Sequence, residues 1–104
     1  MQHFDLCVIG AGPAGFAAAM RALDFDKNVC LVERKKPGGA GIHNGALSSK
    51  TLWELSVRYE RAICDRYGYN TYGADLSYAA VTGEMRKAVN EKYVQLRSQI
   101  DYFV

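Results

Sequence analysis

The sequence predicts an α/β fold that consists of one βαβ unit followed by two helices, with an incomplete sheet. Two short apolar runs, residues 4–9 and 28–32, lack polar alternation, which is typical of parallel strands buried on both faces. Between them, Pro13 stands in the first turn of an Ala-rich helix predicted over residues 14–23. Strand, helix and strand fit within roughly thirty residues, the size of one right-handed βαβ unit.

The segment after the second predicted strand is expected to form a loop and then a helix. Residues 35–44 are rich in glycine and basic side chains, a composition too irregular for a strand or a stable helix. A second helix is predicted over residues 49–66, although Thr51 and Glu54 form a capping-box pattern that would start it slightly later. Turn-forming residues then predict a turn region over residues 67–75.

A third, long helix is expected after Ser77, a residue type that favours the N-cap position. Its apolar residues recur mostly at intervals of three, four and seven positions and therefore share one face: Val81, Met85, Val89, Leu96, Ile100 and Phe103. Two strands rarely form a self-sufficient sheet. We therefore expect that the chain is a fragment of a longer protein, or that it forms a homo-oligomer through this helix and the incomplete sheet.

The composition favours small molecules or proteins as partners. The formal charge of +2 is spread along the chain, so neither nucleic acid nor a membrane surface is an expected partner. The first apolar run lacks a basic leader and the length of a membrane span, which favours a cytoplasmic location. Cys7, Cys30 and Cys64 match no metal-ligand spacing, so we expect no metal site and interpret all three as small buried hydrophobic residues.

The first predicted strand is followed directly by glycines at the spacing GxGxxG, in the segment Gly10-Ala11-Gly12-Pro13-Ala14-Gly15. A strand before the glycines and a helix after them make this weak pattern a dinucleotide-binding fingerprint of Rossmann type. Gly10 permits the tight turn, Gly12 lets a pyrophosphate approach the backbone, and Gly15 allows close helix–strand contact. Backbone N–H groups of this segment, which includes Pro13 and Ala14, are expected to surround the anion.

Glu33 ends the second predicted strand about twenty residues after the glycines, where a carboxylate can accept hydrogen bonds from an adenosine ribose. Arg34 follows it and is interpreted in two ways: it screens a 2′-phosphate if the ligand is NADP, or it stacks on an adenine. The fingerprint with Glu33 therefore predicts a dinucleotide ligand and leaves its identity open.

These residues, with the segment that follows them, resemble the pyridine nucleotide-disulfide oxidoreductases, a family that includes glutathione reductase and dihydrolipoamide dehydrogenase. The family's first FAD segment continues from the strand that ends in Glu into the signature GGTCxNxGCxPSK. Residues 38–50 of this chain read GGAGIHNGALSSK. The glycine pair, Gly45, Ser49 and Lys50 match at the family's spacing, so the resemblance favours FAD over NAD.

The resemblance also implies roles for individual residues in binding FAD. Gly39 and Ala40 would lie along the pyrophosphate and the ribityl chain, and Gly45 and Ser49 belong to the same cofactor-binding segment. Lys50 would point toward the reactive edge of the isoalloxazine, where a cation stabilises reduced, anionic flavin.

The chain departs from the family at its two redox cysteines, which are replaced here by Gly41 and Ala46, while Ser48 replaces the proline. Without this thiol pair, dithiol–disulfide exchange next to the flavin is excluded. Cys30 and Cys64 lie outside the matching positions and are not expected to substitute.

The resemblance covers residues 1–104, as the N-terminal part of an FAD/NAD(P)-binding domain without the nicotinamide-binding and dimerisation domains. It implies an FAD-binding segment of an NAD(P)H-dependent oxidoreductase whose electron acceptor is not a disulfide, and the 104 residues alone are expected to be inactive. Two alternatives stay open. One is a non-catalytic nucleotide-binding or interaction module that dimerises through the third helix, and the other is an NAD(P)-binding Rossmann domain.

Overall fold

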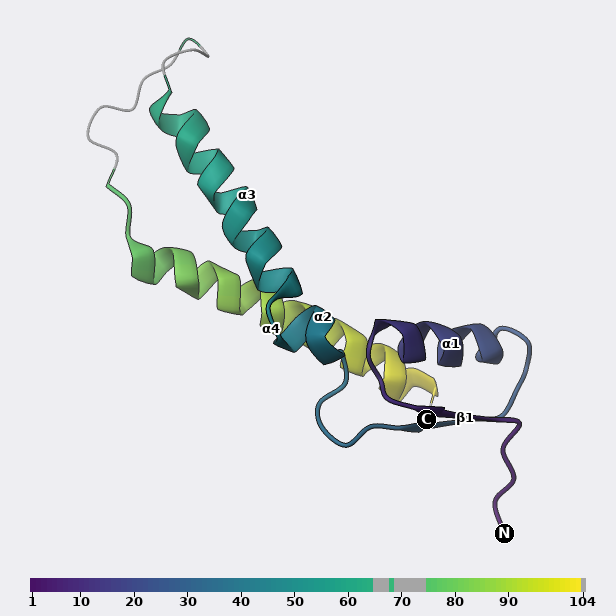
Figure 1. Cartoon of the computed structure of the whole chain (residues 1–104). Helices are drawn as coiled ribbons and strands as arrows, with labels where there is room; N and C mark the ends of the chain where they lie inside the picture. The colour runs from purple at the N-terminus through teal and green to yellow at the C-terminus, as the bar shows by residue number, and fades with distance from the viewer. Residues whose placement is uncertain (65–67, 69–74, 104) are drawn as a thin grey trace.

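The computed structural model describes residues 1–64, 68 and 75–103, and Figure 1 shows the arrangement of their helices and strands. The described elements are two strands and four helices, in the order β1 (Leu6–Ile9), α1 (Pro13–Leu23), β2 (Val29–Val32), α2 (Gly39–His43), α3 (Ala46–Ile63) and α4 (Tyr78–Phe103). The two strands form a parallel sheet. The predicted α/β class, with its βαβ unit and small sheet, is confirmed.

The βαβ unit is shorter at its strands than the apolar runs predicted. The register pairs Leu6 with Val29 and runs through to Ile9 with Val32. Just before the ladder, the backbone N–H of Asp5 donates to the Asn28 carbonyl at 2.8 Å, and the Asn28 N–H donates to the Asp5 carboxylate at 2.9 Å. These bonds close the end of the sheet that lies away from the glycine fingerprint.

The sheet is covered on one face only within the described part of the chain. Val8 lies on the α1 side, next to Gly15, so the alternation of a strand directs Cys7 and Ile9 to the other face. Ile9 is 87% exposed and Val32 on the neighbouring strand is 48% exposed. The prediction of strands buried on both faces is therefore wrong here, because described helices pack against only one face.

The three cysteines are not buried, contrary to their interpretation as small core residues. Cys7 is exposed, and Cys30 and Cys64 are partly exposed free thiols. Cys7 and Cys30 pair directly in the ladder and lie on the uncovered face, and this position explains their exposure. Partial desolvation raises the pKa of the Cys30 thiol, and the neighbouring Cys7 raises it further.

The glycine-rich segment after β2 contains a helix, where the sequence predicted only a loop over residues 35–44. Gly38 precedes α2 with φ of 116°, and Gly45 follows it with φ of 107°, both in the left-handed region that favours glycine. Between them Ile42 is buried and holds this single turn in place. Two sharp reversals thus isolate a helix of five residues, which is too short to show a hydrophobic period.

Helix α3 begins at Ala46, earlier than either start that the sequence suggested. Gly45 is its N-cap residue, and the Ser49 N–H donates to the Gly45 carbonyl at 2.8 Å. Thr51 lies inside the helix and its hydroxyl donates to the Leu47 carbonyl at 3.0 Å, so the predicted capping box is wrong. The helix ends at Ile63, and the rest of the predicted span falls partly outside the described residues, as does most of the turn region at 67–75.

Helix α4 has the N-cap and the apolar face that the sequence predicted. The Ala80 N–H donates to the Ser77 hydroxyl at 3.2 Å, which confirms the cap. Of the predicted face, Leu96 is buried and Phe103 is exposed, and the other members are partly buried: Val81, Met85, Val89 and Ile100. This face packs on α2 and α3, so the chain itself supplies a partner surface for it.

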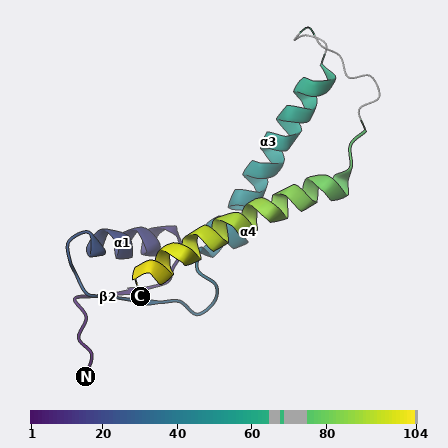
Figure 2. The same ribbon diagram turned by 180° about the vertical axis from the view of Figure 1, so that it is seen from behind.

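The C-terminal part of α4 reaches back to the βαβ unit, as Figure 2 shows from behind. Ile100 and Phe103 line a cavity of about 590 Å³ together with Ala19, Leu23 and Leu31 of α1 and β2. Helix α3 extends in the opposite direction, away from the sheet (Figure 1). The molecule is therefore elongated, with a longest extent of 68 Å. Association of copies through α4 or the sheet remains a prediction.

Candidate functional site

The fingerprint loop joins the end of β1 to the start of α1 in a tight turn. Gly10 has φ of 100°, and its N–H donates to the Val32 carbonyl at 2.7 Å. A Cβ placed on Gly15 would lie 1.9 Å from the Gly10 carbonyl oxygen and 3.2 Å from Val8 Cγ1. Only glycine fits at position 15, and the close helix–strand contact expected from the spacing is present.

The N-terminus of α1 is open toward its surroundings. Gly12 is the N-cap residue in extended backbone, and a Cβ at Gly12 would meet nothing within 4 Å. The first turn has no acidic residue and no side-chain cap, and the Phe16 N–H makes the first helical bond, to the Gly12 carbonyl. By helix geometry the N–H groups of Ala14 and Gly15 have no acceptor within the helix. These donors and the helix dipole suit an anion.

Glu33 connects the end of β2 to the fingerprint loop. One carboxylate oxygen accepts the Ala11 N–H at 2.8 Å, and the other accepts the Lys35 N–H at 2.9 Å. These two hydrogen bonds, with Ala11 as the larger cause, lower the pKa of Glu33, so the group is a carboxylate at neutral pH. A carboxylate offers about four lone-pair sites, so capacity for ribose hydroxyls remains after these two bonds.

A cavity of about 620 Å³ lies beside Glu33 and is lined by the basic residues that follow it, Arg34, Lys35 and Lys36. Its remaining lining comes from Gly39, Ala40, His43 and Asn44 in and next to α2. Arg34 is exposed, and the structure pairs it with no carboxylate among the described ion pairs. The predicted residues Glu33, Arg34, Gly39 and Ala40 are thus brought together around one space.

Helix α4 contributes Tyr93 to the margin of this region. The Lys36 ammonium lies 5.7 Å from the Tyr93 ring centre, and the His43 ring meets Tyr93 edge to face at 5.4 Å. The His43 Nε2 is 2.8 Å from the Pro37 carbonyl oxygen. These contacts fix α2 and the basic loop against α4, which gives His43 a structural position in this site.

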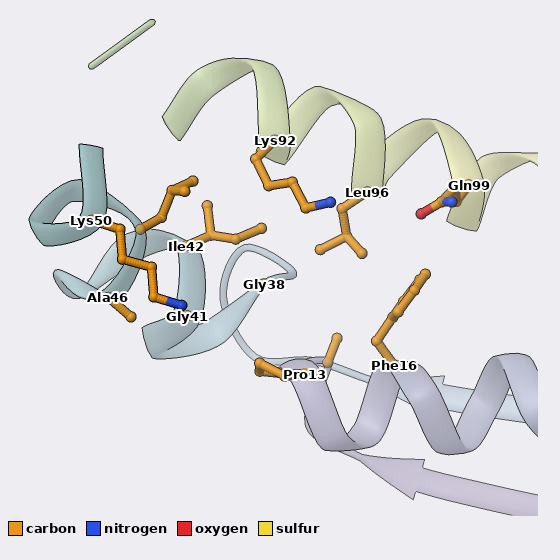
Figure 3. A pocket seen from close by; sticks show the side chains of 13 residues that line it. Pro13, Phe16, Gly38, Gly41, Ile42, Ala46, Lys50, Lys92, Leu96 and Gln99 are labelled. Atoms are coloured by element: carbon orange, nitrogen blue, oxygen red, sulfur yellow. The ribbon is translucent and has the colours of Figure 1, made fainter. Parts of the chain in front are cut away.

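A second cavity, of about 430 Å³, lies on the other side of α2 (Figure 3). The fingerprint contributes Gly12 and Pro13, and Phe16 comes from the next turn of α1. Gly41 and Ala46, at the positions of the family's redox cysteines, line it as well. Lys50 reaches into it from α3.

Residues of α4 complete the wall of this second cavity, although none of them was predicted as a site residue. Lys92, Leu96 and Gln99 follow one another at intervals of four and three positions, so they lie on one face of the helix. The sequence predicts that Leu96 faces the core. Lys92 lies four positions before it and Gln99 three positions after it, and this helical spacing could have identified both residues.

Five predicted site residues line neither of these cavities: Gly10, Ala14, Gly15, Gly45 and Ser49. Gly45 is the N-cap of α3, where its left-handed backbone turns the chain out of α2. The Ser49 hydroxyl donates to the Ala46 carbonyl at 3.1 Å within the first turn of α3. The geometry of Gly45 and Ser49 explains the local start of α3, and any contact with a ligand remains a prediction.

The residues that the comparisons match span almost the whole chain. The model of a protein family described as pyridine nucleotide-disulphide oxidoreductase matches residues 4–102. The chain belongs to this family.

Among the described residues, no three or more histidine, cysteine or acidic side chains form a group that could hold a metal ion. None of the described helices combines the length and the apolar character that a membrane span needs.

Curated members of this pyridine nucleotide-disulphide oxidoreductase family show the same relationship. A dihydrolipoyl dehydrogenase of Zymomonas mobilis is 34% identical over 83% of this chain, and a mitochondrial one of Schizosaccharomyces pombe is 34% identical over 96% of it. A third, from Geobacillus stearothermophilus, is 44% identical over 56% of the chain. The match covers 19% of the length of each of the first two relatives, so the chain spans about a fifth of them.

Proposed function

We propose that the chain binds FAD as the N-terminal part of the FAD-binding domain of an NAD(P)H-dependent oxidoreductase. The observation that carries the proposal is the uncapped N-terminus of α1, which opens into a cavity lined by Gly41, Ala46 and Lys50 of the family's signature segment. Membership of the pyridine nucleotide-disulphide oxidoreductase family supports it. The size and polarity of the two cavities also suit a ligand with an anionic centre and two different ends.

The residues present fit such a cofactor. The N–H groups at Gly12, Ala14 and Gly15 would hold the diphosphate at the positive end of α1. Glu33 would accept hydrogen bonds from the adenosine ribose, with Arg34 beside it. When bound, FAD supplies hydride and electron transfer at its isoalloxazine ring, and this chain supplies binding and orientation.

We further propose that this protein has no dithiol of its own next to the flavin and passes electrons to its acceptor directly from the flavin. Gly41 and Ala46 offer no sulfur to the cavity that they line. Cys7 and Cys30 belong to the uncovered face of the sheet, and Cys64 follows the far end of α3. None of the three is among the residues that line the two cavities. A thiol relay of the kind that needs two adjacent cysteines therefore has no counterpart at this site.

The first experiment titrates the chain with FAD, ADP and NAD by calorimetry and repeats the titrations with Gly12→Val. A Cβ at Gly12 would meet nothing within 4 Å, but valine is a poorer N-cap than glycine, so we expect the unfolding free energy to fall by no more than about 1 kcal/mol. The added side chain would block the approach of a diphosphate, and FAD and ADP affinity should fall at least about tenfold.

A folded chain that binds neither FAD nor ADP would contradict the proposal. Tighter binding of NAD than of FAD would favour the alternative of an NAD(P)-binding domain. Circular dichroism of both proteins before titration separates a lost site from a lost fold.

A further inference from the structure

Helix α4 places a lysine, Lys92, in the wall of the cavity opposite the fingerprint. The resemblance to the family gives no role to this residue. Lys92 comes from α4 and Lys50 from the first turns of α3, and Figure 3 shows both side chains at the cavity. Leu96, one turn after Lys92, is 8% exposed and fixes this part of α4 against the cavity. The position of Lys92 therefore follows from the packing of α4.

The charge around this cavity is of one sign. No carboxylate is among its thirteen lining residues, whose polar side chains are Lys50, Lys92 and Gln99. The described ion pairs use other residues, so neither lysine is neutralised by one of them. The positive end of α1 opens into the same space through Gly12 and Pro13. Groups of like charge around one partly enclosed cavity repel one another and are stabilised by an anion.

The ammonium of Lys92 has capacity for such an anion. It donates one hydrogen bond to the Gln95 side chain, at 3.0 Å, on the next turn of α4. A lysine ammonium carries three donors, so two remain for a ligand. The bond to Gln95 also limits the positions that the flexible side chain takes.

We propose that Lys92 is a cofactor-binding residue that contacts the diphosphate, so that α4 closes the anion site opposite α1. The proposal rests on the proposed function, because it takes FAD as the ligand of the cavity. Lys92 adds a positive charge to the positive end of α1, and a diphosphate within a dinucleotide carries two negative charges. Apolar side chains of Phe16, Ile42 and Leu96 form another part of the wall.

The test compares FAD and ADP binding by Lys92→Gln, Lys92→Arg and the matched control Lys87→Gln. Lys87 is an exposed lysine of the same helix that lines neither cavity of the site. We expect Lys92→Gln to weaken both ligands about five- to tenfold, because it removes one charge-assisted hydrogen bond. Lys92→Arg should stay within about twofold of the wild type, as should Lys87→Gln. Inorganic pyrophosphate should compete with ADP less well in Lys92→Gln.

Three outcomes would overturn the role of Lys92. If Lys92→Gln and Lys87→Gln bind FAD with equal affinity, Lys92 has no role in binding. The proposed function would still stand in that case, because FAD is bound. Equal losses in both Lys92 variants would show that the residue acts through packing, and melting curves of the variants would show the same loss. A folded wild-type chain that binds neither FAD nor ADP would overturn the proposed function as well.

Discussion

Two glycine-rich segments line the site, and they need glycine for different reasons. In the fingerprint, Gly15 is required because the Gly10 carbonyl, in the loop after β1, approaches α1 too closely for any side chain. Around α2, Gly38 and Gly45 are required because their φ angles are positive. At Gly15 glycine is needed because two parts of the chain make close contact. At Gly38 and Gly45 it is needed because of the local backbone conformation. Glycine is therefore required by packing at Gly15 and by the backbone conformation at Gly38 and Gly45.

Gly15→Ala should have the largest effect on stability. The new Cβ would lie 1.9 Å from a backbone oxygen, so α1 must shift away from β1, and we expect a loss of about 3 kcal/mol or more. Urea unfolding followed by circular dichroism measures it. The matched control is Gly83→Ala in α4, where a Cβ meets nothing within 4 Å. There alanine should stabilise the helix by up to about 1 kcal/mol. Similar unfolding curves for the two variants would contradict the packing role of Gly15.

Gly38→Ala and Gly45→Ala should have intermediate and unequal effects. Both place alanine in left-handed backbone, which costs about 1–2 kcal/mol. At Gly38 the Cβ would also lie 2.7 Å from Ile42 Cδ1, whereas at Gly45 it meets nothing within 4 Å. We expect about 2–3 kcal/mol at Gly38 and about 1 kcal/mol at Gly45 from the same unfolding measurement. A larger loss at Gly45 would show that the reversal after α2 matters more than the one before it.

Glu33→Gln should have the smallest effect on stability of these substitutions. The size of the effect should depend on pH. The pKa of Glu33 is lowered in the fold from its ordinary 4.5, so its contribution to stability is present above that value. The contribution is lost as pH falls through the lower, folded pKa. Melting temperatures of wild type and Glu33→Gln should therefore differ at about pH 6–7, and the difference should shrink as pH falls below 4.5. Glu91→Gln, at an exposed position of α4, is the control. A constant difference across this range would rule out the ionised carboxylate as its cause.

The sequence predicted the βαβ unit and the fingerprint because both depend on short-range spacing. The turn at Gly10, the start of α1 at Pro13 and the acid at Glu33 all follow from local patterns. The cap at Ser77 was likewise predictable from one residue type. Helix α2 was missed because five residues between two reversals leave no period to detect.

Long-range packing accounts for the other differences. Lys92 and Gln99 join the site because α4 crosses beside α1, a contact between residues about eighty positions apart that no local pattern encodes. The apolar runs predict strands buried on both faces, because such runs are typical of strands that are covered on both sides. In the described residues one face remains open, and Ile9 and the two strand cysteines are accessible there.

Helix α3 has no buried residue along its eighteen positions, whereas α1, α2 and α4 each have one. Trp53 is 71% exposed, and the helix lies beside α4 while pointing away from the sheet. Its backbone hydrogen bonds are therefore weakly supported by side-chain burial, and local unwinding costs little. Amide hydrogen exchange should be faster along α3 than along α1, where Ala19 is 2% exposed. Trypsin should then cut α3 at Arg58 and Arg61 before it cuts α1 at Arg21.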